Sequence, residues 1–524
     1  MKKIFYLTLV LSVTLIAACK KSGKTNTNPT EPSKIGTTLQ LVQDSVWLYA
    51  KEDYLWFNQL PSYAAFGPRT FTNPDALTAL TNELDALSQY AINPATNAPY
   101  EYSTYDPGTA KYSFIDDGTE SAALNGVKGD FGLDVQYNKV NDLRIEYTYA
   151  GSPAGLAGIH RGDEITSING STSISYDASG YGTGTSTNLN FVSNAIYNSK
   201  SITLALTRTD GSTYTASINT ANYNVNPILK DTILTETNGD KLGYIVFNSF
   251  VSDAVADPLL NAAFTQFANQ GIKDLVVDLR YNGGGYVSTA EHIDNLIVPT
   301  AKGGGLMYNT YYNSNLVAGK DPLLGNQWRV INGADVNYSE FTYAVADNAV
   351  NFAKIGSLNV SRVFFIITGQ TASASELTIN NLRPEMDVQF VGETSYGKPV
   401  GFFDLDINKY ILFTPEFSVQ NSAGQGGYYA GFTPGTSGYP GVNDYDDLTK
   451  DWGDPNEGLL ADILSYVNTG TYAVHKSVTQ SLNSGSFSNS FSAANPKKVS
   501  LNNHRFTGMI GKKTSLLNIL KKNR

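Results

Sequence analysis

Two residues that could carry out chemistry, Ser373 and Lys398, each follow an apolar run typical of a buried strand. Upstream, a third such run leads into the glycine-rich segment Asn282–Gly285. A serine hydroxyl becomes a nucleophile when a nearby base accepts its proton, and a glycine turn leaves backbone amides free to stabilise an oxyanion. A nucleophile, an amine and free amides together predict acyl transfer.

The residues after Ser373 predict its local structure. Ser373 and Glu376 match the capping box, in which a serine caps a helix and a glutamate three residues later bonds back to it. The hydroxyl would then lie at a helix N-terminus, where free N–H groups can stabilise a developing oxyanion. We expect the Ala374 amide to be one donor and a glycine of the Asn282–Gly285 turn to bring a second.

The base that Ser373 needs is predicted to be Lys398. His292 is the one histidine of four that falls in the same predicted domain, and a Ser–His arrangement remains an alternative. Lysine can act only as a neutral amine, which means lowering a pKa near 10.4 by roughly three units, at a cost of about 4 kcal/mol. The nearby apolar side chains that could exclude water are those of Tyr396, Val400, Phe402 and Phe403.

Two other motifs overlap Lys398, and each lacks something that it requires. Residues 392–398 match most of a phosphate-binding loop, but Pro399 stands where Mg²⁺ coordination needs Ser or Thr. Ser395 and Lys398 match S-x-x-K, which needs both residues on one helical face, and Pro399 disfavours that helix. The chain also lacks a G-x-S-x-G elbow, which argues against an ordinary α/β-hydrolase.

The first 19 residues are predicted to be a lipoprotein signal peptide. Two lysines precede an apolar stretch over 5–18, which ends at the only cysteine, Cys19, in a sequence that resembles a bacterial lipobox. The resemblance implies that Cys19 is lipidated. Residues 20–36 are polar and are predicted to form a flexible linker. We therefore expect a lipid-anchored protein of the bacterial cell envelope, attached at the outer membrane and facing the periplasm or the surface.

The remaining chain divides into four segments. Helical apolar spacing over 37–118 predicts a small helical domain, and short β runs with glycine turns predict a β-domain over 119–225. Alternating β and helical runs over 226–474 predict an α/β domain. Residues 475–524 hold nine Lys or Arg and no Asp or Glu, which predicts a disordered basic tail. The net charge of −10 argues against nucleic acid as a partner.

Residues 126–170 resemble a PDZ domain. The likeness rests on the blocks Gly129–Val135, Gly151–Ile159, Gly162–Ile165 and Ile168–Gly170. In that family a glycine loop binds the terminal carboxylate of a peptide, which then adds to the sheet as a strand. The resemblance implies that Phe131, Gly132 and Leu133 bind peptide.

Four further motifs resemble those of the carboxy-terminal processing (tail-specific) proteases. They are Gly243–Phe250, Asp278–Gly285, Thr371–Glu376 and Gly392–Lys398. The resemblance implies a multidomain α+β protein with a ClpP/crotonase-like α/β protease core, in which Ser373 is the nucleophile and Lys398 the general base. The oxyanion hole would consist of the amides of Ala374 and Gly285 (or Gly284), and no cofactor or metal is expected.

One departure from the family pattern lies beside the lysine. Many members carry a glutamine four residues after it, which helps to orient the amine, and this chain has Phe402 there. Either Thr394 or Asn282 orients Lys398 instead, or the dyad is weakened. We predict an endopeptidase that captures unfolded or C-terminal polypeptide segments through the PDZ-like module and cleaves them at Ser373. The alternatives are a catalytically weak or inactive peptide-binding lipoprotein and an esterase on the same scaffold.

Overall fold

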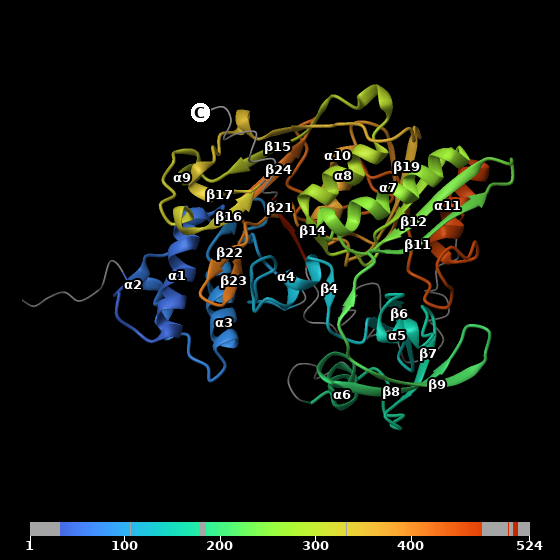
Figure 1. The fold of residues 1–524 in the computed structure, drawn as a ribbon, viewed down its shortest axis with the longest axis horizontal. Helices are drawn as coiled ribbons and strands as arrows, with labels where there is room; N and C mark the ends of the chain where they lie inside the picture. Colours follow the sequence, from blue (N-terminus) through green and yellow to red (C-terminus); the bar gives the residue numbers. More distant parts are fainter. Residues whose placement is uncertain are drawn as a thin grey trace, which may run out of the picture.

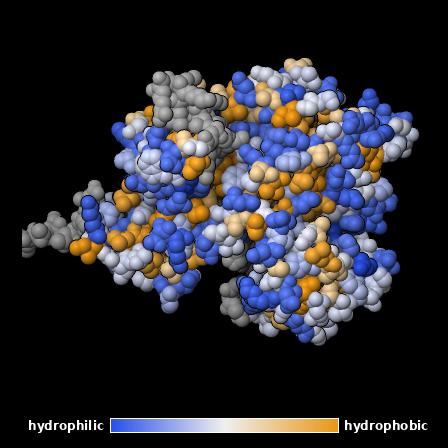
Figure 2. Space-filling view, in the orientation of Figure 1, coloured by the Kyte–Doolittle hydropathy of each residue, from blue (hydrophilic) through white to orange (hydrophobic). Residues whose placement is uncertain are grey.

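The computed structural model describes residues 32–104, 106–177, 185–331, 333–473, 501 and 507–511 (Figure 1). The predicted signal peptide with Cys19, most of the predicted linker over 20–36 and most of the predicted tail over 475–524 lie outside the described residues. None of the helices in these ranges is long and apolar enough to cross a membrane. On the face shown in Figure 2, hydrophobic residues lie in small groups among hydrophilic ones, as on ordinary protein surfaces.

A six-stranded sheet forms the centre of the molecule. In spatial order its strands are β11 (Ile228–Thr235), β12 (Lys241–Phe247), β13 (Asp274–Asp278), β19 (Arg362–Ile367), β20 (Asp387–Gly392) and β25 (Gly441–Asn443). From β12 to β25 all pairs are parallel, whereas β11 pairs antiparallel with β12 at one edge. The middle strands are buried along nearly their whole length, which is why they read as continuous apolar runs.

Helices cover both faces of this sheet (Figure 1). They are α7 (Asp253–Gln270), α8 (Val287–Ile297) and α10 (Ala374–Leu382) on one face and α11 (Gly458–Thr469) on the other. Successive strand residues point to opposite faces, so Val277 shares a core with Phe264 of α7, and Val276 shares one with Leu459 of α11. The predicted α/β core is therefore confirmed.

Two smaller sheets flank the centre. One contains β18 (Ala349–Asn351), β15 (Leu306–Tyr312), β24 (Phe417–Asn421) and β21 (Val400–Gly401), and the other β22 (Leu405–Ile407), β23 (Tyr410–Phe413) and β3 (Phe114–Asp116). The N-terminal helices are α1 (Thr38–Asp53), α2 (Tyr63–Phe66) and α3 (Ala76–Ser88). Trp47 and Tyr54 share a core with Phe402 and Phe413. Strand β3 also pairs with β23. The segment predicted to be a helical domain, residues 37–118, therefore packs directly against residues 400–413 and shares their apolar core.

A five-stranded antiparallel sheet forms a separate lobe, drawn in cyan to green in Figure 1. Its strands, in order, are β5 (Leu133–Lys139), β6 (Asp142–Thr148), β7 (Glu164–Ile168), β8 (Ser201–Thr207) and β9 (Thr213–Asn219), with the helices α5 (Pro153–Leu156) and α6 (Thr187–Ser193). The lobe has its own apolar core. The chain enters the lobe through α4 (Thr119–Leu124) and β4 (Val127–Lys128) and leaves it through β10 (Tyr223–Asn224). Strands β4 and β10 pair with each other.

The described part of the predicted tail is ordered. Leu501 is buried in the core of the β-lobe, and residues 508–510 form β26 (Gly508–Ile510). This strand pairs in parallel with β14 (Gly284–Tyr286) of the glycine turn. The expectation of disorder over 475–524 is therefore wrong at these residues. The physical reason is that apolar side chains inside the basic tail are buried against the core, where residues 508–510 pair with β14.

Two buried arginines connect the β-lobe to the core. Arg280 contacts Asp446 at 2.6 Å, Asp278 at 2.7 Å and Glu457 at 2.9 Å. Arg161 of the lobe contacts the same Asp446 oxygen at 2.6 Å. Buried charges are tolerated when they are paired in this way. The Asp278 and Arg280 side chains of the sequence motif are therefore structural.

Replacing Arg280 with Met should lower the free energy of unfolding by about 3–5 kcal/mol, because it leaves buried carboxylates without their cation. Urea denaturation measures the change. Lys302→Met is the control, since it breaks a half-exposed ion pair with Glu385 and should cost at most about 1 kcal/mol. An Arg280→Met effect as small as the control's would contradict this role.

Candidate active site

Ser373 lies in the sharp turn between β19 and α10. Its backbone has φ +60° and ψ −107°, which strains any residue that carries a β-carbon. Such strain is concentrated at functional sites, and the nucleophile elbow of α/β-hydrolases is a strained strand-to-helix turn of the same kind. Ser373 is fully buried, and its Oγ has no hydrogen-bond partner among the described residues. The predicted capping box with Glu376 is present, with Glu376 accepting from the Ser373 N–H at 3.0 Å, although the Ser373 hydroxyl makes no close hydrogen bond to the helix.

The glycine turn lies against the start of α10. A β-carbon added to Gly284 would stand 3.0 Å from the Ala374 nitrogen, so the two backbones are in contact. Gly284 and Gly285 both have positive φ, of 108° and 139°, which glycine alone adopts without strain. The Gly284 N–H donates to Asn282 Oδ1 at 2.9 Å, so the alternative that made Gly284 an oxyanion donor is wrong. Gly285 is then the remaining glycine expected to donate, and its neighbour in the turn, Gly284, is the one in contact with Ala374.

One buried carboxylate joins the two candidate catalytic segments. Glu376 Oε2 accepts from the N–H groups of Ser373 at 3.0 Å and Lys398 at 2.8 Å. Oε1 accepts from the Gly397 N–H at 2.7 Å and the Ser395 hydroxyl at 2.5 Å. Burial raises the pKa of Glu376, and these four hydrogen bonds act in the opposite direction. The sequence pattern indicated only the capping role of Glu376, because the link to Lys398 requires the fold.

Lys398 follows β20 and is fully buried. Its Nζ donates to the backbone carbonyls of Tyr112 at 3.2 Å and Thr507 at 2.5 Å. The amine also lies 3.8 Å from the centre of the Phe402 ring. The residue that replaces the family's glutamine is therefore an apolar wall of the lysine pocket, and backbone carbonyls take the place of a side-chain amide.

Neither side chain expected to orient the lysine does so. The Thr394 hydroxyl is hydrogen-bonded to that of Thr433 at 3.0 Å. The Asn282 side chain donates to the Phe247 carbonyl at 2.8 Å and accepts from the Gly284 N–H. Asn282 therefore shapes the glycine turn, and both expectations about orientation are wrong.

The pKa of Lys398 is held well below its usual value. Burial is the main cause, since a charged amine in this pocket would lack water; Glu101 opposes the shift and Lys111 adds to it. A neutral amine carries two hydrogens and one lone pair. The carbonyls of Tyr112 and Thr507 can accept both hydrogens, which leaves the lone pair available for a proton.

The N-terminal region builds one wall of this pocket. Buried Glu101 accepts hydrogen bonds from the N–H groups of Tyr112 at 3.0 Å and Ser113 at 2.7 Å, which fixes the segment whose carbonyl meets Lys398. The Tyr112 hydroxyl donates to the Gly397 carbonyl at 2.7 Å. These residues were missed from the sequence because a backbone carbonyl 286 positions away leaves no side-chain signature.

The alternative base, His292, lies elsewhere. It is on α8, and its ring nitrogens face α7, with Nε2 at 3.0 Å from Asn261 Oδ1 and Nδ1 at 3.4 Å from Asp257 Oδ2. Since the Ser373 hydroxyl has no partner among the described residues, the structure does not bring His292 and Ser373 together as a pair.

The loop expected to bind peptide also differs from expectation. Phe131 and Leu133 are buried in the lobe's core. The Gly132 N–H, expected to be free, donates to Asp130 Oδ1 at 2.8 Å. A carboxylate of the chain itself thus occupies one amide of the loop, and any peptide carboxylate must displace Asp130 to use it.

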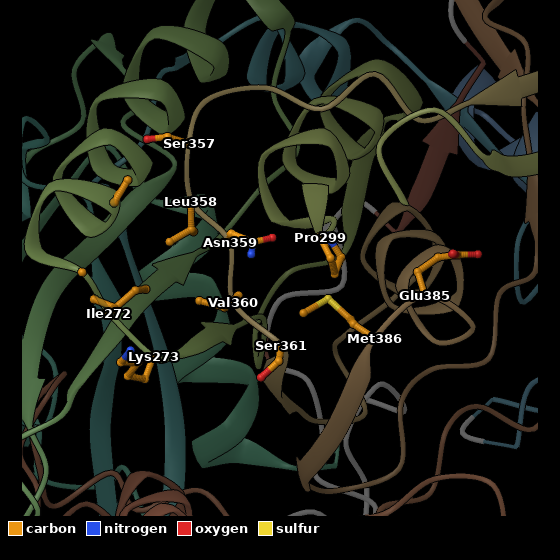
Figure 3. A pocket seen from close by; sticks show the side chains of 12 residues that line it. Ile272, Lys273, Pro299, Ser357, Leu358, Asn359, Val360, Ser361, Glu385 and Met386 are labelled. Atoms are coloured by element: carbon orange, nitrogen blue, oxygen red, sulfur yellow. The ribbon is translucent and has the colours of Figure 1, made fainter. Parts of the chain in front are cut away.

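Of two cavities that the described residues line, the smaller contacts the glycine turn. A cavity of about 600 Å³ (Figure 3) lies at the amino ends of the parallel strands, where Lys273, Ser361 and Met386 precede β13, β19 and β20. Ser373 instead follows the carboxyl end of β19, the end at which open α/β sheets bind ligands. A smaller cavity of about 70 Å³ does contact Gly283 and Gly284. The described residues contain no cluster of three or more His, Cys, Asp or Glu that could hold a metal ion.

Known proteins are similar to this chain in sequence and in fold. Residues 241–433 match Peptidase family S41. The chain is 25% identical over 286 residues to a carboxyl-terminal-processing protease of Picosynechococcus sp., covering 53% of this chain and 55% of that protein. It is 26% identical over 299 residues to the carboxy-terminal processing protease CtpA of Bacillus subtilis, covering 57% and 52%. The chain thus spans about half the length of the curated relatives it matches. A candidate S41 protease from Bacteroides fragilis has the same fold, with a TM-score of 0.51 and 23% identity over 82% of this chain and 97% of that one.

These matches define a peptidase domain on an α+β core. The resemblance to the carboxy-terminal processing proteases is confirmed, and residues 241–433 match the model of peptidase family S41.

Glu376→Gln should lower the free energy of unfolding by about 1–3 kcal/mol for each buried N–H left without an acceptor, because an amide nitrogen cannot accept hydrogen bonds. Urea denaturation measures this. The control is Glu164→Gln, a partly exposed glutamate of the β-lobe, expected to change stability by less than about 0.5 kcal/mol. Equal stability of Glu376→Gln and the wild type would show that the carboxylate does not hold the site together.

Lys398→Met should change how stability depends on pH. Unfolded Lys398 binds a proton up to about pH 10.5, while the folded amine loses it at lower pH, so the wild type gains stability as pH rises between these limits. Relative to Lys398→Met, that gain should be about 1.4 kcal/mol per pH unit inside this window. Lys320→Met, at an exposed position, is the control. A difference between wild type and Lys398→Met that does not vary with pH would mean that the folded amine is charged.

Proposed function

We propose that the protein is a serine endopeptidase that cleaves polypeptides with a Ser373–Lys398 dyad. The observation that carries this proposal is the Glu376 carboxylate, which holds the strained serine turn and the loop of a buried lysine against each other. The lowered pKa of Lys398 supports its role as a base, since only the neutral amine can accept a proton.

The mechanism follows from these positions. Ser373 Oγ attacks the carbonyl carbon of the scissile peptide while Lys398 Nζ takes the hydroxyl proton. The N–H groups of Ala374 and Gly285 stabilise the oxyanion, which preorganised donors at a helix N-terminus do without reorganisation. The C–N bond then breaks, and Lys398 passes its proton to the leaving amine. A water molecule, activated by the same amine, hydrolyses the acyl-enzyme ester and frees Ser373.

The substrates are unfolded or C-terminal segments of other polypeptides. An extended chain suits this site because β14, beside the start of α10, pairs with an extended segment, β26, along one edge. The β-lobe, in which β5 and α6 share one apolar core, acts in this proposal as a PDZ module that holds the substrate. Lipidation of Cys19 would keep the enzyme at the bacterial envelope, at the outer membrane, where unfolded chains are its targets.

Ser373→Ala and Lys398→Ala should each abolish degradation of an unstructured, fluorescently labelled polypeptide. Lys398→Arg should also be inactive, because a guanidinium does not give up its proton. The wild-type rate should rise with pH through the lowered pKa of Lys398. Ser314→Ala, at an exposed position, is the control and should keep full activity. Full activity of Lys398→Ala would refute the dyad.

A second candidate is a peptide-binding protein with little or no catalysis. It is favoured by the fact that Lys398 Nζ bonds to two carbonyls, while the Ser373 hydroxyl has no partner among the described residues. A fluorophosphonate probe separates the two functions. Labelling that Ser373→Ala prevents supports the peptidase, and peptide binding without any labelling supports the binder.

A further inference from the structure

Residues 507–511 of the chain occupy the groove beside Ser373 as an added strand. On one side β26 pairs with β14, and the Gly508 N–H donates to the Gly283 carbonyl at 2.9 Å. On the other side the Phe402 N–H donates to the Met509 carbonyl at 2.8 Å, and the Gly511 N–H donates to the Phe402 carbonyl at 2.9 Å. The segment is therefore held between the glycine turn and the wall of the lysine pocket, as an extended peptide would be.

The register of this strand places it on the catalytic groups. Gly508 is paired with Gly284. A β-carbon added to Gly284 would stand 2.2 Å from the Gly508 carbonyl oxygen and 3.0 Å from the Ala374 nitrogen. In a parallel ladder that carbonyl faces the Gly285 amide. The preceding carbonyl, of Thr507, accepts a hydrogen from Lys398 Nζ. The segment thus faces the Gly285 amide, lies near the start of α10 and engages Lys398.

Buried apolar side chains anchor the segment. Met509 is fully buried in the main core, and Ile510 is 3% exposed in the core that contains Phe402. Six residues upstream of Thr507, Leu501 is buried in the core of the β-lobe, and its carbonyl accepts from the Ser193 hydroxyl of α6 at 3.2 Å. The tail therefore contacts both the lobe proposed to hold substrate and the groove proposed to cleave it.

We propose that this groove is a binding site for the chain's own segment 507–511, which acts as an intramolecular competitor of polypeptide substrates. This proposal rests on the proposed function, because the polypeptide substrates that the segment keeps out are those of the proposed peptidase. Ser373 and Lys398 are both fully buried, so no other chain can reach them while the segment is in place. A substrate must displace the segment and pair, as an extended strand, with the same edge of β14.

The test weakens the segment within the full chain. Met509→Asp combined with Ile510→Asp puts two charges in apolar surroundings and should release the strand. Gly508→Pro, a second variant without added charge, removes the N–H that donates to Gly283. In degradation of an unstructured labelled polypeptide, each should lower the apparent KM about ten-fold and leave kcat within about two-fold, as expected when the open fraction rises from a tenth or less.

Val330→Asp is the matched control, since it adds a charge at an apolar position that is 70% exposed, and its KM should stay at the wild-type value. Wild-type KM in both tail variants would overturn the proposal. It would also be overturned if mass spectrometry showed the wild type, but not Ser373→Ala, removing its own residues beyond Gly508, because the segment would then be a substrate and not a resident competitor.

A binding measurement keeps this proposal separate from the proposed function. In a Ser373→Ala background, a fluorescent peptide with the sequence of residues 505–512 should bind at least about ten-fold more tightly when the tail variants are added. A scrambled peptide should show no such gain. If no variant degrades polypeptide but the peptide gains affinity, the peptidase is refuted and the competitor stands. If degradation occurs and neither KM nor peptide affinity changes, the competitor is refuted and the peptidase stands.

Discussion

The buried carboxylate of Glu376 is the interaction on which the rest of the site depends. It joins the turn after β19 to the loop after β20, and these two segments carry Ser373 and Lys398. Four donors surround it, which offsets the loss of water on burial. Its charge also favours a charged amine nearby, so the burial of Lys398 has to outweigh that attraction. The site therefore combines a carboxylate that positions the backbone with an apolar pocket that lowers the pKa of Lys398.

The lysine pocket shows how this requirement is met without the family's glutamine. Phe402 closes the pocket and excludes water, which a polar amide would do less well. Orientation of the amine then falls to the backbone carbonyl of Tyr112 in the N-terminal region, joined by that of Thr507 while the tail segment is in place. Backbone carbonyls cannot be lost by substitution, but they are only as well placed as the segments that carry them. Glu101 supplies that placement for Tyr112.

The parts of this site that the sequence predicted are those encoded locally. Ser373 and Lys398 follow apolar runs, and such runs become parallel strands whose carboxyl ends meet at one edge of a sheet. The partners of the lysine could not be predicted, because they are 286 and 109 positions away and act through main-chain atoms. The tail was misjudged for a related reason. Average composition predicts disorder, but five residues with two buried apolar side chains, Met509 and Ile510, are ordered against β14.

The pairing of β3 with β23 carries a consequence for evolution by recombination. The segment that matches the peptidase family spans residues 241–433, yet its lysine depends on a carbonyl from the segment before β3. A gene fragment encoding the family segment alone would move Ser373 and Lys398 into a new protein and leave one wall of the lysine pocket behind. The N-terminal region and the peptidase core are therefore expected to be inherited as one unit, whereas the β-lobe, with its own core, is the part that can be exchanged.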